Sequence, residues 1–263
     1  MALLQTNFFA ESLGLSTTMT VILPQPTSHQ IGMASAARTA GHPVLYLLHG
    51  LSDDDTIWLR RTAIERYVAA LGLAVVMPQV SRSFYTDEAH GNRYWTFLSE
   101  ELPALVSDFF NVSTRREDTF VAGLSMGGYG ALKWALRQPE RFAAAASLSG
   151  ALDVAAMRGR GGRSEVLDLV FGAGEVSGTE NDLLHLIHTA DATRLPSLYL
   201  ACGTEDHLVQ DNRTFVAACT ENGVELTTDF GPGQHRWDYW DEKIQQVLAW
   251  LEAQSPAAFP TSG

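Results

Sequence analysis

The chain has few of the residues that cross-link folds or bind nucleic acid. Only two of its 263 residues are cysteine, Cys202 and Cys219. A domain of this length does not need them as staples, so both are expected to be buried thiols of a reducing compartment. Lysine and arginine number 18 against 30 aspartates and glutamates, a formal net charge of −12. The sequence contains no block of Lys or Arg that could follow a phosphate backbone. We therefore expect no nucleic-acid partner.

Long apolar runs and targeting signals are also lacking. The longest apolar runs, at residues 44–48 and 73–77, have the length of a strand and are far too short to span a membrane. Residues 1–14 lack the charged start, apolar run and cleavage site of a secretion signal. We therefore expect a cytoplasmic protein without membrane association. The content of 46% hydrophobic and 18% charged residues is typical of a globular chain.

Short apolar runs alternate with helical patterns along the chain. Apolar runs bounded by Gly, Pro or acidic residues are typical of strands covered on both faces, as in a parallel sheet. The alternation predicts an α/β fold with a mostly parallel central sheet flanked by helices. The predicted strands are residues 19–23, 44–48, 73–77, 119–122, 143–148 and 198–201, with an edge strand at 224–230. The predicted helices are residues 63–71, 94–110, 127–137, 209–221 and 237–253. Pro103 is expected to kink or split its helix.

One segment, residues 151–196, is longer than an ordinary connection. It opens with the glycine- and arginine-rich residues 158–163 and contains a short helical pattern at 181–188. We interpret it as a small cap inserted over the carboxyl edge of the sheet, within a single domain of residues 1–263. An ordinary surface excursion is the alternative.

The sequence Gly-Leu-Ser-Met-Gly at residues 123–127 fits the pattern G-x-S-x-G. The pattern gains weight from its context, because a strand-like run precedes it and a helical pattern follows. Such a serine lies on a strained turn at a helix N-terminus, where free N–H groups favour a developing oxyanion. Gly123 and Gly127 suit positions where neighbouring segments leave no room for a Cβ atom. Ser125 is therefore the predicted nucleophile.

A serine hydroxyl needs a base to take its proton and a carboxylate to orient that base. In this architecture the chain order is Ser, acid, His, with the histidine in the loop after the last strand. That order selects His235 as the base. The acid predicted after strand 198–201 is Asp206, with Glu205 and Asp153 as alternatives.

The other histidines have structural interpretations. We expect His49 to hold its loop by hydrogen bonds and His207 to be a surface residue that points away from the acid beside it. His185 and His188 are expected to be solvated helix residues, because no carboxylate or cysteine at ligand spacing supports a metal site. No metal or organic cofactor is predicted.

The oxyanion hole needs two backbone donors. The first is predicted to be the N–H of Met126, directly after the nucleophile. The second is predicted in the loop after strand 44–48, where Gly50 lets the N–H of Leu51 approach the substrate.

Four motifs together resemble one known family. They are residues 47–51, 123–132, 201–206 and 232–240, which span most of the chain. They are similar to the tributyrin esterase branch of the esterase D and S-formylglutathione hydrolase family. The resemblance implies an α/β-hydrolase fold, the triad Ser125, Asp206 and His235, and the oxyanion donors Leu51 and Met126. The family includes short-chain carboxylesterases, acetyl and feruloyl esterases, S-formylglutathione hydrolases and mycolyltransferases.

The predicted function is that of a serine carboxylesterase that hydrolyses acetyl to butyryl esters through an acyl-enzyme. The alternatives are an S-formylglutathione hydrolase or another thioesterase, or an acyltransferase with the same triad. Leu124 stands where formylglutathione hydrolases usually carry a histidine, which favours simple esters. The expected partner is a small-molecule ester, and the resemblance also implies self-association. Residues 171–184 look like the same branch, and the aromatic residues at 84–95 and Trp58 either line the site or belong to the core.

Overall fold

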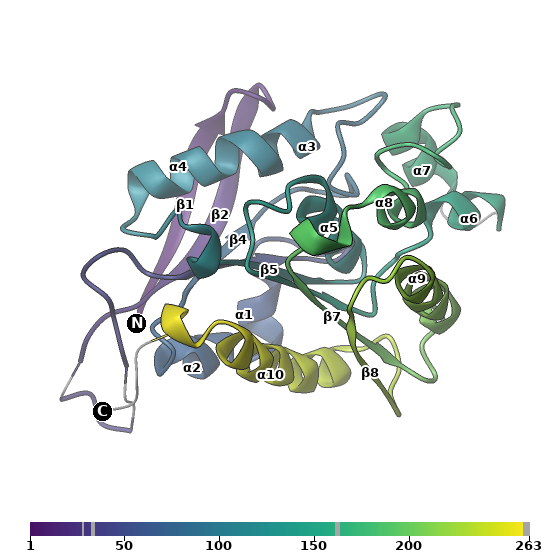
Figure 1. Ribbon diagram of the computed structural model, residues 1–263. Helices are drawn as coiled ribbons and strands as arrows, with labels where there is room; N and C mark the ends of the chain where they lie inside the picture. Colours follow the sequence, from purple (N-terminus) through teal and green to yellow (C-terminus); the bar gives the residue numbers. More distant parts are fainter. Residues whose placement is uncertain (28, 33–34, 161–163, 260–263) are drawn as a thin grey trace.

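The computed structural model describes residues 1–27, 29–32, 35–160 and 164–259. Residues 161–163, part of the predicted opening of the cap, lie outside the described residues, as do residues 260–263 of the tail. The strands form an eight-stranded sheet in the order β1-β2-β4-β3-β5-β6-β7-β8 (Figure 1). Their bounds are β1 Ala2–Ala10, β2 Leu15–Leu23, β3 Val44–Leu48, β4 Ala74–Pro78, β5 Thr119–Leu124, β6 Ala144–Leu148, β7 Ser197–Gly203 and β8 Thr227–Gly231.

The sheet is mostly parallel, as predicted. Strands β4, β3, β5, β6, β7 and β8 pair parallel, and β2 joins β4 antiparallel. Strand β1 was not predicted from the sequence; it pairs antiparallel with β2 from Ala2 opposite Leu23 to Ala10 opposite Leu15. Strand β1 is at the edge of the sheet, and most of its residues are exposed or half-buried. An edge strand of this kind lacks the apolar run that marks a buried strand.

Helices cover both faces of the sheet (Figure 1). Helices α1, α2 and α10 lie on one face, and α4, α5, α8 and α9 lie on the other. The bounds are α1 Ile57–Arg61, α2 Ile64–Ala69, α3 Tyr94–Thr96, α4 Leu102–Phe109, α5 Met126–Arg137, α6 Val154–Gly159, α7 Ser164–Phe171, α8 Leu183–Thr189, α9 Val209–Glu221 and α10 Trp237–Gln254. None of the described helices has the length and apolarity to cross a membrane.

The helix predicted at residues 94–110 changes its winding before Pro103. A π-helical turn, Phe97–Glu101, separates α3 from α4, and Pro103 lies in the first turn of α4. Pro103 has no N–H to donate to the preceding turn, and the Ser99 carbonyl in that turn accepts from Arg141 at 3.1 Å. The helical backbone continues from α3 through the π turn into α4, so the helix is not split at Pro103, and the predicted kink stays a prediction.

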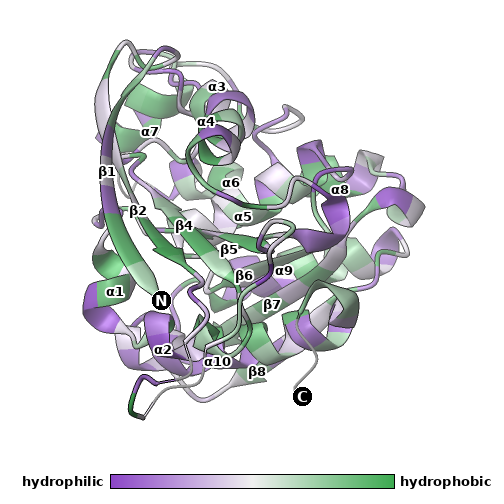
Figure 2. Ribbon diagram, turned by 90° about the vertical axis from the view of Figure 1, so that its left-hand side faces the viewer, coloured by the Kyte–Doolittle hydropathy of each residue, from purple (hydrophilic) through white to green (hydrophobic). Residues whose placement is uncertain are grey.

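The strands supply two hydrophobic cores, one on each face. In the fully buried β3, Tyr46 packs into the core under α5 while Leu45 and Leu47 pack into the core under α10. The alternation follows from the period of two residues along a strand. Figure 2 shows the resulting concentration of hydrophobic residues in the central strands. This rigid sheet positions the loops at its carboxyl edge.

The segment 151–196 contains α6, α7 and α8, between β6 and β7. The Ala89 N–H donates to the Val170 carbonyl at 2.8 Å, which ties the end of α7 to the loop before α3. The Tyr129 hydroxyl of α5 donates to the Asn181 carbonyl at 2.8 Å, just before α8. At its start, the Ala151 N–H donates to the carbonyl of Ser125 at 3.0 Å. The inserted segment is thus docked beside the predicted nucleophile.

Candidate active site

Ser125 occupies the sharp turn between β5 and α5. Its φ of 53° and ψ of −116° are unusual for a residue with a side chain and cost of order 1–3 kcal/mol. Glycines make the turn sterically possible. A Cβ atom on Gly123 would lie 2.3 Å from the Gly127 carbonyl oxygen, and one on Gly127 would lie 2.4 Å from the Leu48 carbonyl oxygen. The strained turn predicted from G-x-S-x-G is therefore present.

The structure brings Ser125, His235 and Asp206 into one hydrogen-bonded line. His235 Nε2 is 3.0 Å from Ser125 Oγ, and His235 Nδ1 is 2.8 Å from Asp206 Oδ2. The three side chains stand at the carboxyl ends of β5, β7 and β8, which run parallel and meet at one edge of the sheet. Because an ionised carboxylate only accepts, Nδ1 carries the imidazole proton and Nε2 accepts from the serine hydroxyl.

Asp206 is buried, with 2% of its surface exposed. Burial acts to raise the pKa of its carboxyl group, but hydrogen bonds from His235 and from the Leu208 N–H at 2.8 Å outweigh it. The net effect lowers the pKa of Asp206 below its usual value, so this carboxylate stays charged at neutral pH. A fixed negative charge at this point orients the His235 ring.

The two alternative acids have other contacts. Glu205 is exposed, and its carboxylate accepts from the Gly233 N–H at 2.6 Å, which fixes the loop that carries His235. Asp153 caps α6 by accepting from the Ala156 N–H at 2.9 Å. Of the three candidate acids, Asp206 is the one that hydrogen-bonds to His235, and the contact between Glu205 and Gly233 was not predicted from the sequence.

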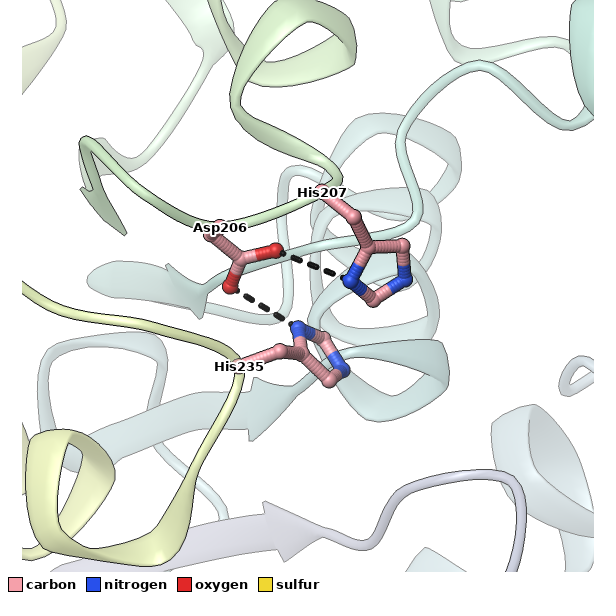
Figure 3. A group of neighbouring side chains, drawn as sticks. All are labelled: Asp206, His207 and His235. Atoms are coloured by element: carbon pink, nitrogen blue, oxygen red, sulfur yellow. Dashed lines mark hydrogen bonds and ion pairs between the residues drawn. The ribbon is translucent and has the colours of Figure 1, made fainter.

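The expectation for His207 was wrong. Its ring points toward the predicted acid, with Nδ1 3.5 Å from Asp206 Oδ1, and its centroid is 4.6 Å from that of His235 (Figure 3). The side chain is 59% exposed, so the surface location was correct. The chain turns tightly at this point, where the Asp206 N–H donates to the Gly203 carbonyl at 3.1 Å. This turn puts two consecutive side chains on the same side, unlike a strand.

His49 holds the loop after β3, as predicted. Its Nε2 accepts from the Val80 N–H at 3.1 Å, so Nδ1 carries the proton and donates to the Gly50 carbonyl at 2.7 Å. Burial lowers the pKa of His49, which keeps the ring neutral. The buried Tyr85 hydroxyl also donates to the His49 carbonyl at 2.9 Å. Tyr85 is among the aromatic residues expected either to line the site or to belong to the core, but this contact was not predicted because it spans 36 residues of chain.

The two predicted oxyanion donors stand on segments that touch. A Cβ atom on Gly127 would lie 2.7 Å from the His49 carbonyl oxygen, so the start of α5 packs directly on the loop that leads to Leu51. Met126 is the first residue of α5, where an N–H group has no intrahelical acceptor. Leu51 and Ser125 line the same cavity.

A cavity of about 400 Å³ opens beside Ser125. It is lined by Gly50, Leu51, Ser52, Asp53, Leu124, Ser125, His235, Arg236, Trp237 and Trp240. The Trp240 ring lies perpendicular to the His235 ring, with centroids 4.8 Å apart, and packs against it. Trp58 is a core residue with 1% of its surface exposed, and the aromatic residues at 84–95 are also buried. The aromatic wall of the cavity comes instead from the first turn of α10.

A strained serine on a strand-to-helix turn at the carboxyl edge of a mostly parallel sheet defines an α/β-hydrolase that acts through a serine. A family model described as "Putative esterase" matches residues 10–251, and the chain belongs to this esterase family. An acetyl esterase of Caldicellulosiruptor saccharolyticus is 30% identical over 262 residues, which cover 95% of this chain and 98% of that protein.

Two solved structures from Staphylococcus aureus have the same fold. FphF, a fluorophosphonate-binding serine hydrolase with substrate bound, has a TM-score of 0.86 at 35% identity, over 95% of this chain and 98% of that one. The apoenzyme of the S-formylglutathione hydrolase FrmB has a TM-score of 0.83 at 35% identity, with the same coverage. The predicted resemblance to the esterase D family is confirmed, and the chain is a serine-type carboxylic ester hydrolase.

Proposed function

We propose that this esterase hydrolyses short-chain acyl esters, acetyl to butyryl, by two successive acyl transfers through Ser125. The line of hydrogen bonds from Asp206 through His235 to Ser125, at 2.8 and 3.0 Å, carries the proposal. The cavity of about 400 Å³ supports small substrates, because ligand pockets commonly range from about 300 to 1,000 Å³. The 30% identity to an acetyl esterase supports the same choice.

In the first transfer, the oxygen of Ser125 attacks the ester carbonyl while its proton passes to Nε2 of His235. Asp206 stabilises the imidazolium that forms. His235 then gives the proton to the leaving alcohol, the bond between the carbonyl carbon and the alcohol oxygen breaks, and an acyl-serine remains. In the second transfer, water attacks the acyl group, His235 takes a proton from the water, and Ser125 recovers that proton as the acid leaves.

The N–H groups of Leu51 and Met126 stabilise the oxyanion in both transfers. The close contact of Gly127 with the His49 carbonyl supports this role, because it fixes the two backbone segments against each other. Removing one such donor typically costs about 3–4 kcal/mol of transition-state stabilisation. Neither transfer requires a metal or an organic cofactor.

Residues 151–196 act as the cap of this site. The hydrogen bond from Ala151 to the carbonyl of Ser125, and the docking of α7 and α8 on neighbouring segments, support the proposal. None of the described residues of 151–196 lines the cavity beside Ser125. The proposed cap therefore packs next to the site without forming a wall of this cavity.

A thioester is the second candidate substrate. The 35% identity to the S-formylglutathione hydrolase of S. aureus favours it. A series of 4-nitrophenyl esters from acetate to octanoate, measured beside S-formylglutathione, separates the two candidates. We expect the highest kcat/KM between acetate and butyrate. A kcat/KM for S-formylglutathione at least tenfold above that of every ester would make the thioester the substrate.

A further inference from the structure

The side chains of Asp206, His207 and His235 bring together three atoms that could ligate a metal ion (Figure 3). Their ligand atoms all lie within 4.8 Å of one another. The Asp206 carboxylate has one oxygen 2.8 Å from His235 Nδ1 and the other 3.5 Å from His207 Nδ1. The proposed esterase reaction uses only two of these three side chains, and His207 has no part in it.

We propose that these three residues bind Zn²⁺ and that the bound ion inhibits the esterase. Two imidazoles and one carboxylate are the donor set of known three-ligand zinc sites, which complete their tetrahedron with water. Ligands about 2.0–2.2 Å from zinc lie roughly 3.3 Å apart in a tetrahedron. His235 Nδ1 and His207 Nδ1 lie 2.8 and 3.5 Å from different oxygens of Asp206, and all three ligand atoms lie within 4.8 Å of one another, so the side chains must rotate to bring one oxygen and two nitrogens to that spacing.

The cluster is accessible to an ion from solvent. The His207 side chain is 59% exposed and that of His235 is 20% exposed. The formal net charge of −12 also raises the local concentration of cations around the molecule.

Inhibition follows from the tautomer of His235. In the free enzyme its single proton is on Nδ1, and Nε2 accepts from Ser125. When zinc takes the lone pair of Nδ1, the proton of the neutral ring moves to Nε2. Nε2 then donates to Ser125 Oγ and no longer accepts the proton of the hydroxyl. The nucleophile loses its base while the fold and the cavity stay unchanged.

The inhibition rests on the proposed function, whereas metal binding is measured without it. Calorimetric titration of Zn²⁺ into the Ser125→Ala variant tests binding with the three ligands intact and no turnover. We expect one ion per chain. His207→Ala, made in the same background, removes one of three ligands and is expected to weaken binding by at least about tenfold. His207→Gln serves as a second variant of similar size.

The activity arm uses 4-nitrophenyl acetate in a buffer that does not chelate metals. Zinc is expected to inhibit the wild type. The midpoint of inhibition, which is the zinc concentration that halves the zinc-free rate of a given protein, is expected to rise at least tenfold in His207→Ala. His90→Ala removes an exposed histidine outside the cluster and should leave the midpoint unchanged. Mg²⁺, which prefers oxygen ligands, should not inhibit.

Absence of zinc binding to the Ser125→Ala variant would overturn the proposal. An equal inhibition midpoint in wild type and His207→Ala would also overturn it, because the ion would then act elsewhere. Zinc binding that depends on His207, in a protein without esterase activity, would support the metal site and refute the proposed esterase function.

Discussion

The carboxylate of Asp206 fixes the tautomer of His235, and an asparagine at this position should reverse it. Asp206 Oδ1 accepts from the Leu208 N–H at 2.8 Å, and Oδ2 accepts from His235 Nδ1 at 2.8 Å. An asparagine side chain has a single acceptor oxygen, and the Leu208 N–H continues to donate to it. Its NH₂ group then faces Nδ1, which must accept, so the ring proton moves to Nε2 and blocks proton transfer from Ser125.

The loss in rate follows from that tautomer. The corresponding change in a Ser-His-Asp triad lowers kcat about 10⁴-fold, and at about 1.36 kcal/mol per decade this is about 5.5 kcal/mol of transition-state stabilisation. We expect the same order of loss in Asp206→Asn, measured as kcat on 4-nitrophenyl acetate. The KM should change little, because the acid does not line the cavity.

The rival acid provides a matched control. Asp153→Asn makes the same chemical change at the N-cap of α6, where asparagine caps as well as aspartate. Its kcat should stay within twofold of the wild type. A decrease of less than tenfold in Asp206→Asn, or an equal decrease in both variants, would refute the assignment of the acid.

Three further predictions concern the support of the site and the stability of the fold. Gly127→Ala puts a Cβ atom 2.4 Å from the Leu48 carbonyl oxygen. The free energy of unfolding in urea should therefore fall by about 1–3 kcal/mol, and kcat should fall as well. A decrease in the free energy of unfolding of less than about 0.5 kcal/mol would contradict the close contact. Tyr85→Phe removes the hydroxyl that donates to the buried His49 carbonyl, which should cost about 1–3 kcal/mol and lower kcat more than it raises KM; unchanged kcat would show that this bond does not position the oxyanion loop. Asp118 is buried, and although burial acts to raise its pKa, hydrogen bonds from a serine and two arginines lower it below the value of about 3.9 in the unfolded chain. Its contribution to stability is thus present above about pH 4 and is lost as the pH falls through the folded pKa. The difference in unfolding free energy between the wild type and Asp118→Asn should therefore shrink in acid. A difference that stays constant with pH would contradict this prediction.

The sequence predicted the triad because two simple rules constrain it. Apolar runs located the parallel strands, whose carboxyl ends meet at one edge, and the chain order Ser, acid, His then selected Ser125, Asp206 and His235 from many candidates. Steric limits at Gly127 could also be anticipated, because the strained turn requires them. These features depend on the local pattern and the topology alone.

The contacts around the triad could not be predicted in the same way. The direction of the His207 ring depends on a tight turn whose geometry is set by the contacts around it. The bond from Gly233 to Glu205 joins two loops that are far apart in the chain. Strand β1 and the short helices α1 and α6 were missed, because an edge strand and helices of five or six residues show no clear apolar period.

The covalent intermediate gives the most direct test of the central proposal. The wild type is mixed with 4-nitrophenyl butyrate, quenched in acid during turnover, digested and analysed by mass spectrometry. We predict one butyryl group on the peptide that contains Ser125, and neither adduct nor turnover in Ser125→Ala. A butyryl group on another residue, or wild-type turnover by Ser125→Ala, would contradict the proposal.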